Sequence, residues 1–170
     1  MLEYNGIKLS PIEIEDLQIL NKWKNDEEIF KYLGGGYHPT SMTQQRKWVE
    51  KMTENTQEEQ RYIIVNEEHK RIGFIGLYNI SPINRTCLLG IYIGEKEYWR
   101  KGVASRAYLA LEKYARQYIN IRKIRLEVVK NNVGAIKMYE KLGFSICGEY
   151  KEERYVDGKY QDVILMEKFI

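Results

Sequence analysis

The sequence has few of the residues that mark disulfide-rich, metal-binding or membrane-spanning proteins. It contains two cysteines, Cys87 and Cys147, and two histidines. Both cysteines lie in apolar settings outside any metal-spaced cluster, which favours two buried thiols in a reducing compartment and no metal site. No apolar run approaches the length of a transmembrane helix, and the first residues lack a signal-peptide pattern. We therefore expect a cytoplasmic protein that has no membrane partner.

Strong charge of one sign is also missing. The net charge is +3, and the basic residues are not gathered into a tract, which argues against a nucleic-acid partner. Internal repeats and low-complexity linkers are absent from the sequence. A length of 170 residues suits one hydrophobic core. We expect a single domain over residues 1–170, and a homo-oligomer is left open.

Hydrophobic patterns predict an α+β fold. Alternating apolar residues predict strands at 6–10, 61–65, 71–78, 86–93, 124–129, 145–150 and 160–169. Helical spacing predicts one helix that Ser10 caps with Pro11 in its first turn, a second that Thr40 or Ser41 caps, and others at 103–118 and 132–142. The order is a β-meander followed by βαβαββ, a sheet that is antiparallel first and mixed later.

A short basic loop with a glycine stands between an apolar strand and the start of a helix. Its residues are Tyr98-Trp99-Arg100-Lys101-Gly102-Val103-Ala104-Ser105. The first N–H groups of a helix have no carbonyl partner and carry positive potential, so they attract phosphate. Gly102 lets the backbone approach an anion, while Arg100 and Lys101 add charge. The stretch predicts a phosphate or pyrophosphate site, although an ordinary strand–helix turn with a solvated basic pair has the same features.

A second segment extends this pattern and reads Asn131-Asn132-Val133-Gly134-Ala135-Ile136-Lys137-Met138-Tyr139-Glu140-Lys141-Leu142-Gly143-Phe144. Together the two segments resemble the GCN5-related N-acetyltransferases, the GNAT family. The loop is similar to that family's acetyl-coenzyme A motif, Q/R-x-x-G-x-G/A, through Trp99 to Ala104. The second segment is similar to N-x-x-A-x-x-x-Y-x-K-x-G-F through Asn132, Ala135, Tyr139, Lys141, Gly143 and Phe144. The resemblance covers residues 85–170 well and the first 80 in outline.

The resemblance implies a twisted, mostly antiparallel mixed sheet with a splayed parallel strand pair, flanked by about four helices. It implies an acyltransferase that moves an acetyl group from acetyl-CoA to a primary amine by direct attack on the thioester. Loop N–H groups would hold the pyrophosphate, and a strand edge would bond the pantetheine arm and face the thioester oxygen. The cofactor-binding residues would be Ile91, Tyr92, Ile93, Arg100, Lys101, Gly102, Val103, Ala104, Ser105, Asn132 and Lys141.

Tyr139 is the general acid that the resemblance implies. The departing thiolate needs a proton, and a tyrosine held near the sulfur can donate one. The alternative is that Tyr139 only packs its helix, because Ile136, Met138 and Leu142 lie nearby in the sequence. Asn132 can cap this helix and also bond the pantetheine amide, so its two roles are compatible.

The general base is left open by the sequence. Many relatives carry a glutamate on the strand before the loop, where this chain has Leu88 in the run Cys87-Leu88-Leu89-Gly90. Glu127 is the remaining candidate, with a salt-bridged strand residue as its structural alternative. His38 or a chain of waters to solvent can also serve.

The resemblance implies that the acceptor is a small-molecule amine or a peptide N-terminus. By resemblance, the Gly34–Thr40 loop closes over it, and Glu28, Tyr37 and Glu127 are the expected substrate-binding residues. The run from Gly148 to Tyr160 looks like the spermidine and ribosomal-protein alanine N-acetyltransferase branches, so a polyamine such as spermidine is one acceptor. Carboxylates at residues 26–28, or at 149, 152 and 153, would then hold it. An amino sugar, a protein N-terminus or a weakly catalytic acetyl-CoA-binding module stays open.

Overall fold

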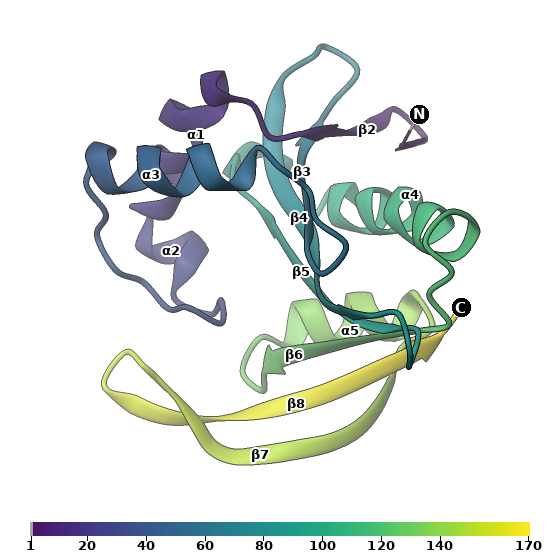
Figure 1. The fold of residues 1–170 in the computed structure, drawn as a ribbon. Helices are drawn as coiled ribbons and strands as arrows, with labels where there is room; N and C mark the ends of the chain where they lie inside the picture. Colours follow the sequence, from purple (N-terminus) through teal and green to yellow (C-terminus); the bar gives the residue numbers. More distant parts are fainter. Residues whose placement is uncertain (1) are drawn as a thin grey trace.

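The computed structural model describes residues 2–170 (Figure 1). The strands are β1 Glu3–Tyr4, β2 Ile7–Pro11, β3 Gln60–Val65, β4 Arg71–Ser81, β5 Thr86–Ile93, β6 Lys123–Val129, β7 Ser145–Val156 and β8 Lys159–Phe169. The helices are α1 Leu17–Lys24, α2 Glu27–Phe30, α3 Met42–Met52, α4 Val103–Gln117 and α5 Val133–Lys141, with 3₁₀ turns η1 Ile14–Asp16 and η2 Lys96–Tyr98. None of the helices from residue 2 onward is long and apolar enough to cross a membrane.

One mixed sheet organises the chain, which confirms the predicted α+β class. Its eight strands lie in the order β1-β2-β3-β4-β5-β6-β8-β7. All neighbours pair antiparallel except β5 and β6, which are parallel. The predicted meander corresponds to β3, β4 and β5, and α4 is the crossover that a parallel pair requires. Five α-helices stand where about four were expected, because α2 is a separate single turn.

Helices cover both faces of the first half of the sheet (Figure 1). Strand β3 shows the reason, because its successive residues Ile63 and Ile64 are both buried but belong to different cores. Ile63 shares a core with residues of α1 and α3, whereas Ile64 shares the other core with residues of α4 and α5. A strand buried on both faces is a continuous apolar run, and 62–65 is one.

The prediction of a helix beginning at Ser10 and Pro11 is wrong. Both residues belong to β2, where they lie opposite Ile63 and Tyr62 of β3. The helical segment begins at η1, and the Glu13 and Asp16 side chains cap each other's backbone there. Proline at the end of a strand is compatible with the sheet, so the serine–proline pair was not a sufficient signal. The second predicted cap is confirmed, because Ser41 Oγ accepts from the N–H of Gln44 at 3.1 Å.

The two cysteines differ in their surroundings. Cys87 is buried in β5, and burial raises the pKa of its thiol to about 12. The prediction that Cys147 is also buried is wrong. Cys147 lies on β7, the edge strand of the sheet, and its side chain is exposed like most of that strand. Strand β7 is also longer than predicted, because bulges near Ile146 and Tyr150 let it continue to Val156.

A close approach fixes α1 against the end of β5. A methyl group on Gly94 would lie 2.2 Å from the Trp23 ring, and the ring is fully buried. We therefore expect Gly94→Ala to lower the free energy of unfolding by about 1–3 kcal/mol through overpacking. Chemical denaturation measures this change. Gly134→Ala is the matched control, since a methyl there meets nothing within 4 Å, and a stability loss equal to that of Gly94→Ala would contradict the packing argument.

Candidate active site

Strands β5 and β6 separate after three residues. Their parallel pairing is confined to Thr86, Cys87 and Leu88 of β5, opposite residues 123–125 of β6. Beyond Leu88, β5 continues its pairing with β4, and β6 continues with β8. The edge of β5 from residue 89 onward therefore faces an opening instead of a strand. Such an edge offers free backbone groups to an extended, amide-bearing ligand.

A cavity of about 950 Å³ lies at this opening. Its wall contains most of the residues predicted from the sequence, namely Ile91, Tyr92, Ile93, Arg100, Gly102, Val103, Ala104, Ser105, Glu127, Asn132, Tyr139 and Lys141. Lys101, Glu28 and Tyr37, also predicted, are not part of the wall. The structure thus brings the loop, β5, β6 and α5 around one space, with α1, α2 and α3 at its other side.

The loop before α4 has the backbone of an anion site. Gly102 is the N-cap of α4 with φ of +69°, a left-handed conformation that glycine adopts without steric cost. A methyl at Gly102 would meet nothing within 4 Å, so the space beside this helix start is open. The Trp99 indole N–H donates to the Ile93 carbonyl at 2.8 Å, which fixes the loop to the end of β5.

Helix α5 places two further candidates at the cavity. Asn132 is its N-cap, and its side-chain oxygen accepts from the N–H of Ala135 at 3.4 Å. Tyr139 is 8% exposed, and its ring packs edge-to-face on Phe144 with centroids 5.6 Å apart. Burial raises the pKa of the Tyr139 phenol, so the hydroxyl keeps its proton well above neutral pH. Packing and proton donation are therefore compatible at this residue.

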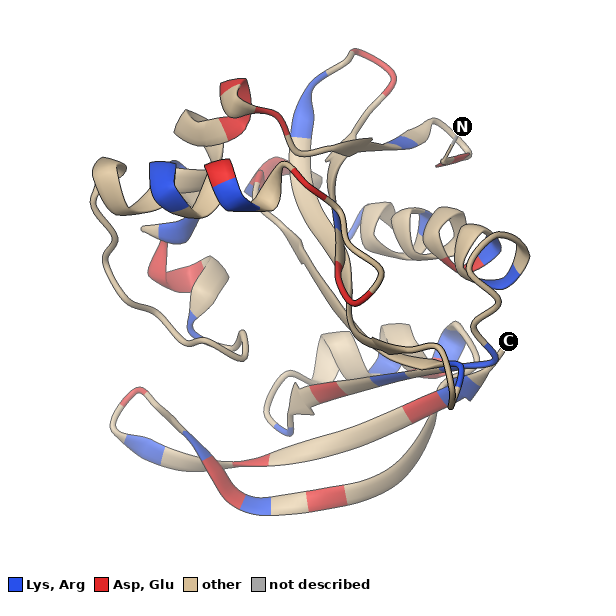
Figure 2. Ribbon diagram, in the orientation of Figure 1, with Lys and Arg blue, Asp and Glu red and all other residues tan. Residues whose placement is uncertain are grey.

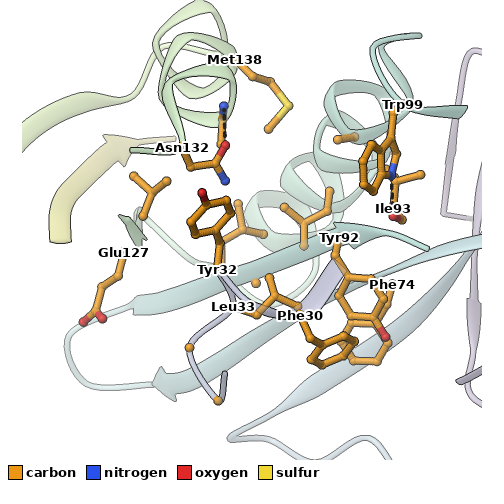
Figure 3. Close-up of a pocket in the computed structure, with 18 of the residues that line it drawn as sticks. Phe30, Tyr32, Leu33, Phe74, Tyr92, Ile93, Trp99, Glu127, Asn132 and Met138 are labelled. Carbon is orange, nitrogen blue, oxygen red and sulfur yellow. Dashed lines mark hydrogen bonds between the residues drawn. The ribbon is translucent and has the colours of Figure 1, made fainter. Parts of the chain in front are cut away.

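Aromatic side chains form the opposite wall. Tyr92 stacks on Phe74 with centroids 5.3 Å apart, and Phe30 meets the same Tyr92 ring edge-on at 5.1 Å (Figure 3). Trp48 packs on Phe74, and Tyr32 reaches the wall from the segment after α2. This arrangement forms an apolar surface suited to a methylene chain. No sequence signal pointed to Phe74.

The carboxylates after α1 are held away from the cavity. Lys96 of η2 makes ion pairs with Asp26 at 2.9 Å and with Glu28 at 2.6 Å. The Lys96 ammonium lowers the pKa of the Asp26 carboxyl through this hydrogen bond. Glu28, expected to bind substrate, lies outside the wall, and its carboxylate joins α2 to η2. His38 also lies outside the wall.

Glu127 is the one carboxylate in the cavity wall among residues 2–170. Its Oε2 lies 3.3 Å from Nη2 of Arg154, which is on β7. Lys24 also lines the wall, where burial lowers its pKa and its ammonium lies 4.4 Å from the centroid of the Phe30 ring. Sequence reasoning missed Arg154 and Lys24, because each is one of many charged residues of both signs spread along the chain (Figure 2).

The donor set fits a coenzyme with a pyrophosphate and an amide-rich arm. The left-handed Gly102, the open helix start and the unpaired β5 edge provide anion and amide partners in one continuous cavity. Within the described part of the chain, no group of three or more histidine, cysteine, aspartate or glutamate side chains is placed to hold a metal ion.

Comparison with known proteins agrees with this geometry. The acetyltransferase (GNAT) domain family matches residues 7–145. Spermidine N(1)-acetyltransferase of Escherichia coli K12 is 30% identical over 162 residues, covering 95% of this chain and 85% of that protein. The Vibrio cholerae spermidine N-acetyltransferase, solved with CoA and spermine, superposes with a TM-score of 0.88 at 27% identity and covers 96% of this chain and 95% of its own. This chain therefore belongs to the GNAT family, and it is an acyltransferase that uses acetyl-CoA as its co-substrate.

Proposed function

We propose that the enzyme acetylates a terminal primary amine of a polyamine. The observation that carries this proposal is a cavity lined by the loop before α4, by an aromatic wall and by one carboxylate, Glu127 of β6. The aromatic wall suits the methylene chain, and the carboxylate suits a second ammonium group. Relatives that acetylate spermidine support the same acceptor class.

The coenzyme-binding roles follow from the elements around the cavity. We assign the pyrophosphate to the N–H groups from Arg100 to Ser105, with Lys101 and Lys141 as charges at the rim. The β5 edge at residues 91–93 and the side chain of Asn132 would bond the pantetheine arm. Acetyl-CoA supplies an activated acyl group, and an N–H of the β5 edge stabilises the charge that develops on its carbonyl oxygen.

The chain must also move two protons. An alkylammonium with a pKa near ~10 must lose one before the nitrogen can attack. Leu88 stands in the cavity wall and Glu127 is assigned to the second ammonium group, so a chain of waters to solvent is the proposed acceptor of that proton. Tyr139 is the proposed donor to the thiolate that leaves, because it reaches the cavity with its hydroxyl neutral.

A second acceptor class has a specific observation in its favour. Lys24 lines the cavity without an ion-pair partner in residues 2–170. A partly buried cation of this kind is stabilised by an anionic group. An amine that also carries a carboxylate, such as an acidic peptide N-terminus, is therefore the second candidate. The free thiols of Cys87 and Cys147 support a cytoplasmic site of action for either acceptor, and we propose that residues 1–170 act as one domain.

Thiol release across a panel of amines tests the proposal. We expect kcat/KM for spermidine to exceed that for n-butylamine by about tenfold or more, the value of one favourable charge contact. An acidic peptide or an amino sugar should be slower than spermidine. A peptide that outperforms spermidine would favour the Lys24-based alternative. If the protein bound acetyl-CoA but acetylated no amine of the panel, the result would support the acetyl-CoA-binding module instead of an enzyme.

A further inference from the structure

Arg154 connects three separate parts of the acceptor side. Its Nη2 lies 3.3 Å from Glu127 Oε2 on β6, and its Nη1 donates to the Tyr32 carbonyl at 3.1 Å. Arg154 itself belongs to β7, so one guanidinium joins the sheet to the segment that follows α2. Its side chain is 18% exposed, which means that the contact is partly shielded from water.

A second charged contact lies beside the first. Lys31 Nζ is 3.5 Å from Asp157 Oδ2, at the turn between β7 and β8. Positive and negative residues are mixed along this hairpin (Figure 2). The Arg154–Tyr32 and Lys31–Asp157 contacts together hold residues 31–34 against it. Arg154 also stands within 3.7 Å of the position of a Cβ on Gly34. The glycine segment that covers the acceptor side is thus tethered to the β7–β8 hairpin.

We propose that Arg154 is an internal occupant of the site for the second ammonium group of the acceptor. In the free enzyme its guanidinium takes the position beside Glu127. When a diamine or polyamine binds, its distal ammonium replaces the guanidinium, and the bond to the Tyr32 carbonyl is released with it. Arg154 is therefore a specificity-determining residue. This inference rests on the proposed polyamine acetylation.

The charges around the cavity make the exchange favourable. Glu127 is the single carboxylate in the described wall, while Asp26 and Glu28 are held by Lys96. A distal ammonium therefore has no other carboxylate in that wall. The Arg154 pair is a single contact of 3.3 Å to a carboxylate that is 40% exposed, not a bidentate pair. Contacts of this kind are weak, so a positioned ammonium can replace one.

Kinetics of two Arg154 variants test the exchange. Arg154→Gln removes the competing charge, and we expect the KM for spermidine to fall about threefold to tenfold. The KM for n-butylamine, which has no second ammonium, should change by less than about twofold. Arg154→Lys keeps a competing cation and should stay near the wild-type value. Lys159→Gln is the matched control, because it removes one positive charge from the same hairpin at a residue without an ion pair in residues 2–170.

Amide hydrogen exchange provides a readout that needs no acceptor. The N–H groups of Leu33 and Gly36 bond to carbonyls of Phe30 and Leu33 within the tethered segment. We expect Arg154→Gln to speed their exchange severalfold, while Lys159→Gln leaves it unchanged. Adding spermidine to the wild type should speed the same amides. Protection that is equal in Arg154→Gln and wild type would overturn the tether.

A double-mutant cycle links the effect to Glu127. In a Glu127→Gln background, Arg154→Gln should no longer lower the KM for spermidine, because the contested carboxylate is gone. A KM that rises in Arg154→Gln would overturn the proposal, since the guanidinium would then assist binding. Failure of the wild type to acetylate any polyamine would instead refute the proposed function, and amide exchange would still decide whether Arg154 tethers the segment.

Discussion

Gly102→Glu is expected to weaken acetyl-CoA binding by about 100-fold. The substitution places a carboxylate at the start of α4, where we assign the pyrophosphate, and like charges brought together cost several kcal/mol. It also forces a side chain into a left-handed conformation with φ of +69°, which costs about 1–2 kcal/mol. Isothermal titration calorimetry with acetyl-CoA measures the change in affinity.

Two control variants separate charge from backbone strain. Gly102→Ala meets nothing within 4 Å, so it introduces strain without a clash or a charge. Gly102→Asn tolerates the left-handed region and should bind the coenzyme better than the glutamate variant. Unchanged affinity in Gly102→Glu would refute the placement of the pyrophosphate at this loop.

Tyr139→Phe is expected to lower kcat by about 10²–10⁴-fold, the range of one lost acid catalyst. The fold should survive, because the ring keeps its contact with Phe144 and the hydroxyl makes no hydrogen bond within residues 2–170. Single-turnover kinetics of thiol release and chemical denaturation measure the two effects. Wild-type turnover in the variant would show that water or another group protonates the thiolate.

The pH dependence of kcat, measured for the wild type and for Tyr139→Phe, is a further check on the role of Tyr139. Burial raises the pKa of the phenol, and only the neutral form can donate a proton. As pH rises, the acid is therefore retained beyond the usual tyrosine value of about 10. The ratio of wild-type to Tyr139→Phe kcat should stay constant between about pH 7 and about pH 10. A ratio that falls in this window would contradict a neutral, buried donor.

The second half of the chain was predictable because its signals are local. The basic loop with Gly102 needs a left-handed residue before a helix, and Asn132 caps a helix that starts after a strand. The residues that form the loop and the cap lie within a few positions of one another, so both features can be recognised in the sequence. A splayed parallel strand pair followed from the family resemblance, and the structure shows that β5 and β6 form it.

The acceptor side was less predictable because long-range contacts decide it. Glu28 is four residues from Lys24 in the sequence, yet its partner is Lys96. Arg154 on strand β7 contacts Glu127 and Tyr32, and no local sequence pattern predicts these two contacts. The start of the first helix failed for a related reason, since pairing of Ser10 with Ile63 outweighed a local cap signal.

The short pairing of β5 with β6 has a consequence for the stability of the enzyme. Within residues 2–170, three residue pairs of β5 and β6 join the two halves of the sheet. A ligand that hydrogen-bonds to the free edge of β5 replaces part of the β5–β6 hydrogen bonding that ends at Leu88. Such a ligand therefore stabilises the folded sheet as well as taking part in the reaction. At a concentration 100 times its Kd, such a ligand stabilises the native state by about 2.7 kcal/mol. The thermal tolerance of this acetyltransferase therefore depends on the supply of its own co-substrate.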